Sequence, residues 1–175
     1  MKNFKYIFFL IVITSCNAPQ AVYDYDKQVQ FNSLRTFQIY PELNSNLSQL
    51  DEKRMQTILA LEMSKKGLSQ TSEDSDVYLN YYTSSYETPS RSNIGIGVGG
   101  TGRNVGVGVS GGIPIGGPDT HLRITFDLIS VKNDALIWQA VVDSPFDLNT
   151  SPGKREEQLR VIVSKALEGY PPKKR

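Results

Sequence analysis

The stretch from Asn93 to Gly117 contains letter matches to two catalytic motifs. Gly97–Gly102 fits the G-x-G-x-x-G pattern of dinucleotide-binding loops, and Asp119 stands where such sites carry the acidic residue that binds the ribose. Such a loop must open a helix, because the helix N-terminus binds the pyrophosphate. The residues that follow include Gly106 and Gly108, and each glycine disfavours a helix by about 1 kcal/mol. The sequence therefore argues against a dinucleotide site.

The second match is Gly108–Gly112, which fits the G-x-S-x-G nucleophile elbow with Ser110 at its centre. An elbow also needs a helix directly after the serine, and an acid and then a histidine later in a large sheet. Instead, Pro114 and two further glycines follow, and His121 lies only eleven residues after Ser110. We therefore expect no serine hydrolase site.

Other groups with chemical potential are isolated. His121 is the only histidine, so no histidine pair is available for zinc, and its position predicts a partly exposed polar residue at a strand start. The acidic segment 73–76 lacks the spacing of a calcium-binding EF-hand loop and is interpreted as a polar loop. Glu156–Glu157 falls in the first turn of an expected helix, where carboxylates complement the helix dipole. We expect neither an enzyme nor a metal or cofactor site.

The N-terminus carries a targeting pattern. Lys2 and Lys5 precede the apolar run Tyr6–Ile13, whose eight residues are too few to span a bilayer of about 30 Å as a helix. The following Thr-Ser-Cys resembles the end of a bacterial lipobox, in which Cys16 receives lipid, palmitate included, and becomes the first mature residue. We expect residues 1–15 to be a signal peptide of the lipoprotein type. The alternative is an ordinary signal peptide followed by an incidental cysteine.

Lipidation would have consequences for the rest of the chain. Cys16 is the only cysteine, so no thiol would remain for a disulfide, a metal site or nucleophilic catalysis. Loss of residues 1–15 changes the formal charge from +1 to −1, and without a basic run the chain offers no surface for nucleic acid. Asn17, where an aspartate would resemble an inner-membrane retention signal, favours the outer membrane. No acidic run that resembles a surface-export tag follows it, which favours the periplasmic face. The expected organisation is a lipidated tether over 16–21, a single domain over 22–172 and a basic tail over 173–175.

Strands and helices alternate along the expected domain. The spacing of apolar residues predicts strands over 34–39, 75–87, 121–131 and 136–146, with an extended lead-in before the first. Ser48 begins a helix that stops at Gly67, and Pro152 opens a second helix that stops at Gly169. The apolar residues of the two expected helices are Leu47, Leu50, Met55, Ile58, Leu59, Leu61 and Met63, then Leu159, Ile162, Val163, Ala166 and Leu167. We expect an α+β single domain whose mixed or antiparallel sheet has about four strands, with two helices on one face and the element order β-α-β-β-β-α.

Alternation also explains the glycine-rich insert over 93–117, which precedes the third strand. Apolar residues alternate with glycine on both sides of a turn over 99–104. Two interpretations remain open: a β-hairpin with one branched apolar face and one bare glycine face, or a flexible insert, because glycine weakens strands. An ordered hairpin would offer exposed edges to a partner. The candidate partner or ligand contacts are Ile94, Ile96, Val98, Val105, Val107, Val109, Tyr81 and Tyr82.

The segments together resemble a bacterial lipoprotein family known as domain of unknown function 4136. The matching residues are Asp24–Asp26, Phe31, Arg35–Phe37, Lys66–Leu68, Ser75–Val77, Tyr81–Tyr82, Leu122–Val131, Leu136–Trp138 and Gly169–Pro172. The resemblance covers nearly all of the mature chain and includes a glycine-rich insert before the third strand. It implies an envelope lipoprotein with no established activity and no catalytic residues to carry over. Gln139 after Trp138 departs from the pattern, in which a basic residue or a glycine is expected.

Two functional hypotheses follow. The first is a lipid-anchored, non-catalytic envelope protein that binds or scaffolds an unknown envelope protein through its sheet edge or glycine hairpin. The second is a module that binds a small apolar ligand or a lipid in a groove surrounded by tyrosines, namely Tyr78, Tyr81, Tyr82 and Tyr86. A deep apolar pocket favours the second hypothesis, whereas an open sheet with an exposed edge strand favours the first.

Overall fold

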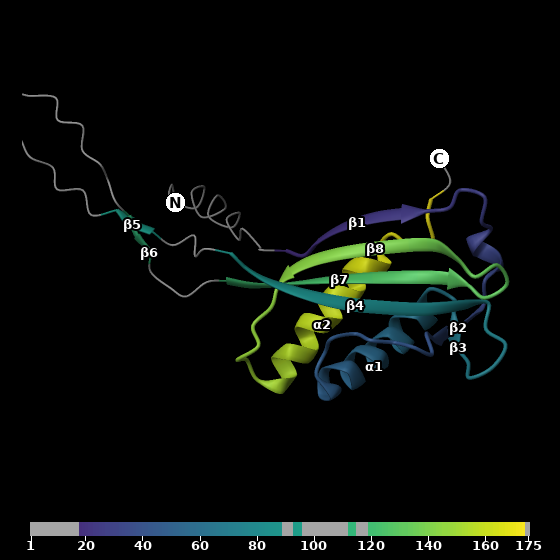
Figure 1. Ribbon diagram of the computed structural model, residues 1–175, viewed down its shortest axis with the longest axis horizontal. Helices are drawn as coiled ribbons and strands as arrows, with labels where there is room; N and C mark the ends of the chain where they lie inside the picture. The colour runs from purple at the N-terminus through teal and green to yellow at the C-terminus, as the bar shows by residue number, and fades with distance from the viewer. Residues whose placement is uncertain (1–17, 89–92, 96–111, 115–118, 174–175) are drawn as a thin grey trace, which may run out of the picture.

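A computed structural model of the chain describes residues 18–88, 93–95, 112–114 and 119–173 (Figure 1). In chain order, the elements are β1 (Gln20–Tyr25), the 3-10 helix η2 (Phe31–Ser33), β2 (Thr36–Ile39), α1 (Gln49–Lys65), β3 (Ser69–Gln70), β4 (Val77–Thr88), β5 (Asn93–Gly95), β6 (Gly112–Pro114), β7 (Asp119–Ser130), β8 (Ala135–Pro145) and α2 (Pro152–Leu167). None of the helices in these ranges is long and apolar enough to cross a membrane. The prediction of a single α+β domain with two helices and a mixed sheet is confirmed.

Six strands form the main sheet, in the order β1-β8-β7-β4-β2-β3. β1, β8, β7 and β4 pair antiparallel, whereas β2 pairs parallel with both β4 and β3. The expected number of about four strands and the expected element order were therefore wrong. Both additional strands lie at the edges: β1 occupies the supposed lead-in, and β3 has only two residues. Pairing with a neighbour makes these segments strands, and their composition does not reveal that pairing.

β5 and β6 form a separate two-stranded antiparallel sheet within the glycine-rich insert. Ile94 pairs with Ile113 in this ladder, at positions that flank the middle of the insert. The other residues of the expected hairpin, including its turn, lie outside the described residues.

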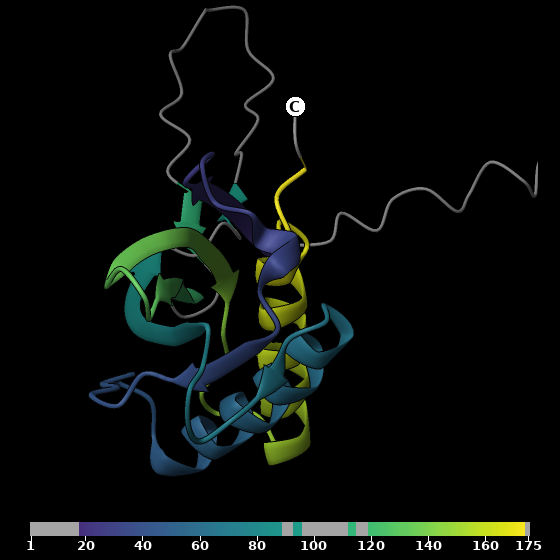
Figure 2. The same cartoon turned by 90° about the vertical axis from the view of Figure 1, so that its right-hand side faces the viewer.

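Both helices cover the same face of the main sheet (Figure 1, Figure 2). Ser48 caps α1, because its hydroxyl accepts a hydrogen bond from the backbone N–H of Asp51 at 3.2 Å, as the capping box predicts. Pro152 stands at the start of α2, where its missing N–H is not needed. The whole apolar stripe predicted for α2 is buried, namely Leu159, Ile162, Val163, Ala166 and Leu167. Burial of this stripe holds α2 against the sheet.

The apolar residues of α1 were predicted less well. Leu50 and Leu61 are exposed, although both were included among the apolar residues at near-helical spacing. They fall outside the narrow stripe that a helix of 3.6 residues per turn presents to a sheet. The residues on that stripe are buried, namely Met55, Ile58, Leu59 and Met63.

The central strands alternate as predicted. The even-numbered apolar residues of β7 are buried in the core, namely Leu122, Ile124, Phe126 and Leu128. Trp138 of β8 is also buried, and its indole N–H donates a hydrogen bond to the carbonyl of Gly169 at 3.3 Å. This contact joins the sheet to the end of α2.

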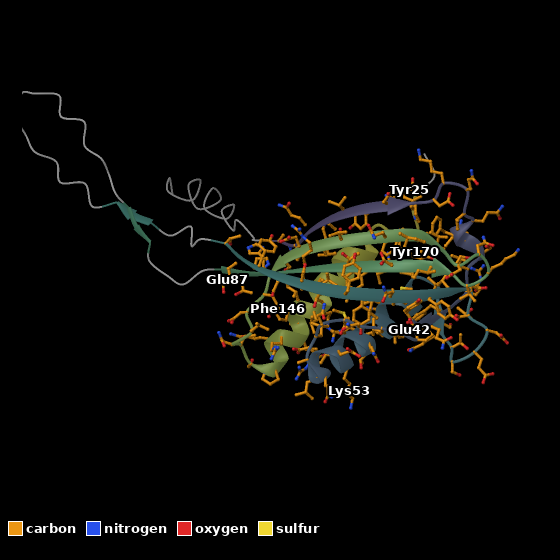
Figure 3. All side chains as sticks on the ribbon, viewed as in Figure 1. Tyr25, Glu42, Lys53, Glu87, Phe146 and Tyr170 are labelled. Atoms are coloured by element: carbon orange, nitrogen blue, oxygen red, sulfur yellow. The ribbon has the colours of Figure 1, made fainter. Side chains whose placement is uncertain are left out.

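The opposite face of the sheet, which neither helix covers, is called the open face here. Strand register places Tyr82, Thr125, Val141 and Val22 in one row across β4, β7, β8 and β1. At one end of the sheet β1 and β7 begin while β4 and β8 end; this is the Gln20 end, which Glu87 marks in Figure 3. Tyr25 marks the opposite end. The start of β1 therefore lies at one end of the open face, and the end of β1 lies toward the other.

Candidate functional site

Four polar side chains from three neighbouring strands meet on the open face at the Gln20 end. Tyr86 of β4 pairs in register with His121 of β7, and Arg123 of β7 pairs with Asp143 of β8. Residues two apart in a strand share a face, so the register brings all four side chains together. We call these residues the Asp143 cluster.

Asp143 is the centre of the cluster. The Tyr86 hydroxyl lies 2.7 and 2.8 Å from its two carboxylate oxygens, and His121 Nδ1 lies 3.0 Å from Oδ1. Arg123 donates from Nε at 3.1 Å and from Nη2 at 2.9 Å to Oδ2. The rings of Tyr86 and His121 stack with centroids 5.3 Å apart, and the Arg123 guanidinium lies 5.3 Å from the Tyr86 ring centroid. The carboxylate thus fixes three side chains in one arrangement.

The electrostatics agree with this geometry. Burial alone would raise the pKa of Asp143, but the hydrogen bonds from Tyr86, His121 and Arg123 outweigh it and lower that pKa below its usual value. The hydrogen bond to Asp143 raises the pKa of the Tyr86 hydroxyl. Asp143 is therefore ionised and Tyr86 neutral at physiological pH, so the cluster presents oriented donors around a fixed negative charge.

A groove of about 670 Å³ lies beside the cluster. It is lined by the four cluster residues and by five residues in or next to β1 and β8, namely Ala18, Gln20, Val22, Val141 and Pro145. The groove therefore combines charged, aromatic and apolar side chains directly at the start of β1. This combination suits the binding of an amphipathic surface.

The middle of the open face carries a different carboxylate. Asp127 of β7 is buried although no helix covers it, and it accepts one hydrogen bond from Gln139 Nε2 at 2.8 Å. Burial raises the pKa of Asp127 more than this hydrogen bond lowers it. Tyr82, one row closer to the Asp143 cluster, is 44% exposed. The middle of the face thus offers an exposed aromatic ring next to a poorly solvated acid.

A second group of residues around a carboxylate lies on the helix side. Asp51 of α1 forms ion pairs with Arg54 at 2.6 Å and with Arg155 of α2, and it accepts a hydrogen bond from the Ser48 hydroxyl at 2.9 Å. A groove there also touches Ser85 and Thr120, the strand neighbours of Tyr86 and His121. This Asp51 cluster, Ser48, Asp51, Arg54 and Arg155, therefore sits at the same end of the sheet on its other side. It joins the two helices.

The predicted contact residues do not form one surface. Tyr81 is buried in the core on the helix side, whereas the adjacent Tyr82 is exposed on the open face, because successive strand residues point to opposite faces. Tyr81 therefore cannot line the predicted tyrosine groove together with Tyr82. Ile94 belongs to β5, where only the backbone is described. The remaining predicted residues lie outside the described ranges, namely Cys16, Ile96, Val98, Val105, Val107 and Val109.

The Asp143 cluster was missed in the sequence, where His121 was interpreted as an isolated polar residue. The expected hairpin of strands over 121–131 and 136–146 brings Arg123 close to Asp143, but its regular register would place Ser144 opposite Arg123. The observed register, which shifts between Leu128 and Ile129, places Asp143 there instead. The acidic segment 73–76 proved structural at Asp76, whose carboxylate accepts backbone hydrogen bonds from Arg35 and Thr36 at 2.8 and 2.9 Å. These hydrogen bonds lower the pKa of Asp76.

The fold is similar to solved structures at low sequence identity. A PDZ domain protein from Parabacteroides distasonis aligns over 90% of this chain with a TM-score of 0.55 and 14% identity, and the alignment spans 38% of that protein's length. The PelC dodecamer from Paraburkholderia phytofirmans aligns over 85% of this chain and 94% of its own, with a TM-score of 0.50 and 12% identity. These two likenesses concern the fold alone.

A family protein of known structure is also similar. A DUF4136 family protein from Bacteroides thetaiotaomicron aligns over 86% of this chain and 95% of its own, with a TM-score of 0.47 and 12% identity. No curated protein matches the chain. Residues 21–172 match the family described as Domain of unknown function (DUF4136). The match extends from β1 to just beyond α2, and the chain therefore belongs to this family.

Proposed function

We propose that the chain is a non-enzymatic, lipid-anchored protein of the cell envelope that binds another envelope protein through the open face of its sheet. The N-terminal pattern ending at Cys16 supports the anchor, at the periplasmic face of the outer membrane. The observation that carries the binding role is the open face itself, on which Tyr82 is 44% exposed and which neither α1 nor α2 covers. Exposed aromatic rings are common anchors of protein interfaces.

The edge strand β1 supports a protein partner. β1 pairs with β8 on one side, and as the terminal strand of the sheet its other side is an edge. An edge strand offers backbone donors and acceptors to an additional strand. Val22, in the middle of this edge strand, is exposed on the open face. A partner that adds a strand to β1 would therefore also contact the open face.

A small apolar ligand is less well supported. Such ligands occupy enclosed, mostly apolar pockets. The groove beside the Asp143 cluster is open, and its lining includes Arg123, His121 and Asp143. PelC from Paraburkholderia phytofirmans, whose fold is similar, forms a dodecamer. The experiment must therefore be able to detect a second copy of this chain as the partner.

Site-specific photo-crosslinking in living cells tests the proposal. A photoreactive residue replaces Tyr82 on the open face or, as the control, Val161 on α2; these side chains are 44% and 42% exposed. We expect a crosslinked protein from position 82 and none from position 161. Mass spectrometry then separates a foreign partner from a second copy. Equal products from both positions, or none from either, would contradict the binding role.

The anchor has its own test. Palmitate labelling of the chain should be lost in the Cys16→Ala variant and retained in a chain that carries Ser15→Ala. Labelling that survives Cys16→Ala would refute lipidation at this residue.

A further inference from the structure

We infer that the Gln20 end of the open face rests against the phospholipid headgroups of the membrane in which the chain is anchored. The inference deepens the proposed function, because it depends on lipidation of Cys16. It assigns the groove beside the Asp143 cluster, with Val22 of β1, to a lipid surface. The protein partner is assigned to β4 around Tyr82, which lies three strands from Val22 across the sheet, and to the β1 edge beyond Val22 toward Tyr25.

The length of the chain before β1 carries the first step. Gln20 begins β1 four residues after Cys16, and an extended residue spans at most about 3.6 Å. The start of β1 is therefore at most about 14 Å from the lipidated residue. β1 then runs away from this point toward Tyr25, at about 3.3 Å per residue. Only the Gln20 end of the sheet is held this close to the headgroup layer.

The second step is the composition of the groove. Val22 is 72% exposed, and Tyr86, Val141 and Pro145 line the same groove. An exposed valine on a soluble surface needs no explanation by itself. Beside a short lipid tether, however, apolar side chains and a tyrosine form the kind of surface that lies at a membrane interface, where tyrosine is enriched.

The third observation is that Arg123 offers a guanidinium group that could bind the lipid phosphate. Its Nε and Nη2 atoms bind Asp143, yet the side chain is 52% exposed, so part of the guanidinium stays open to water or to a phosphate. Arginine binds phosphate oxygens with well-defined geometry. Asp143 would repel a phosphate if its carboxylate were bare. Because Tyr86, His121 and Arg123 all surround that carboxylate, it serves to position Arg123 at the rim of the groove.

Fluorescence quenching in reconstituted vesicles tests the inference. The mature chain, lipidated at Cys16, is placed in vesicles of phosphatidylethanolamine and phosphatidylglycerol that contain a lipid with a nitroxide on its headgroup. A nitrobenzoxadiazole label is attached to Val22→Cys or, as the control, to Leu136→Cys at the other end of the sheet; the two native side chains are 72% and 52% exposed. Since lipid would occupy Cys16, each engineered cysteine is labelled alone.

Compared with vesicles that lack the nitroxide lipid, we expect the label at position 22 to lose most of its fluorescence and the label at position 136 to lose little. Adding Arg123→Ala to the Val22→Cys chain should restore part of the signal, while adding Arg160→Ala on α2 should not. Circular dichroism confirms that each variant is folded.

Flotation separates the failure of the inference from the failure of the anchor. A lipidated chain that does not float with the vesicles would overturn the proposed anchor and the inference with it. A chain that floats, with equal quenching at positions 22 and 136, would overturn the inference and leave the anchor intact. The label at position 22 could stay unquenched in vesicles while the cysteine at position 22 is protected from labelling in isolated envelopes. This result would show that a protein covers the groove, and it would also overturn the inference.

Discussion

Asp51 and Asp143 lie at the same end of the sheet, on its two sides, and each binds an arginine and further donors. Asp51 binds Arg54, Arg155 and Ser48, and its side chain is 2% exposed. Asp143 binds Tyr86, His121 and Arg123, and its side chain is 25% exposed. The two clusters have similar chemistry, and they differ mainly in burial and in what they join.

This difference separates a structural role from a surface role. The Asp51 cluster links the first turns of the two helices through an ion pair. A buried charge must be paired, because an unpaired one is strongly destabilising. The Asp143 cluster links side chains of strands that the backbone ladder already holds, so little stability depends on it. Its arrangement is therefore available for contact with another surface.

The largest expected effect contrasts adjacent residues on the two sides of β4. Tyr81→Ala should lower the free energy of unfolding by about 3 to 5 kcal/mol, as for other buried aromatic side chains, because it leaves a cavity in the core. Tyr82→Ala should lower it by less than about 1 kcal/mol, since that residue is 44% exposed and lies outside the core. Urea unfolding measures both. Similar losses for the two variants would show that the open face contributes to the core.

The carboxylates themselves give the next effect. Asp51→Asn leaves Arg155 and Arg54 without a charged partner in a buried place, and we expect a loss of about 3 kcal/mol. The matched change Asp143→Asn should lower the free energy of unfolding by no more than about 1 kcal/mol, because its partners reach solvent. The measurement is urea unfolding at neutral pH. A larger loss for Asp143→Asn than for Asp51→Asn would reverse the division of roles.

The smallest expected change is in how the free energy of unfolding depends on pH, and it compares Asp143 and Asp127 of the open face. The pKa of Asp143 is lowered in the folded chain, so its contribution is present above the unfolded value of about 3.9 and is lost as pH falls through the folded pKa. The pKa of Asp127 is raised, so ionisation at higher pH weakens the fold. Asp127→Asn should therefore stabilise the chain at pH 7 by less than about 1 kcal/mol.

The pH dependence of urea unfolding checks this contrast. The advantage of Asp127→Asn over the native chain should disappear below about pH 4, where the acid is protonated in both states. Asp143→Asn should instead flatten the loss of stability below that pH. Parallel curves for the two variants would show that the two acids share one environment.

Elements with a strongly periodic apolar pattern could be predicted from the sequence. The stripe of α2 and the alternation of β7 follow from burial on one side, which leaves a repeating apolar pattern. The edge strands were not readable, because β1 and β3 are defined by their partners and not by their composition. Gly169 was recognised as a helix stop, but the fold gives it a second role, since a Cβ there would overlap the ring of Tyr23.

The candidate site was the least predictable part. Tyr86 and Asp143 are 57 residues apart, and they meet only because β4 and β8 both flank β7. The expected hairpin brings Arg123 near Asp143, but its regular register would pair Arg123 with Ser144, and only the observed register, with its shift between Leu128 and Ile129, makes Asp143 the partner. Tyr86 joins them from the third strand, β4. Tyr81 and Tyr82 show the opposite problem, since these neighbours in sequence were assigned to one surface although they point to opposite faces of β4.

The most direct test of the open face as a contact surface is cysteine labelling with a membrane-permeant maleimide, in cells and in the purified chain. Single cysteines replace Tyr82 on the open face or Val161 on α2, whose exposures are 44% and 42%. We predict equal labelling of both positions in the purified chain, and loss of labelling at position 82 alone in the intact envelope. Equal labelling of both positions in cells would contradict the account.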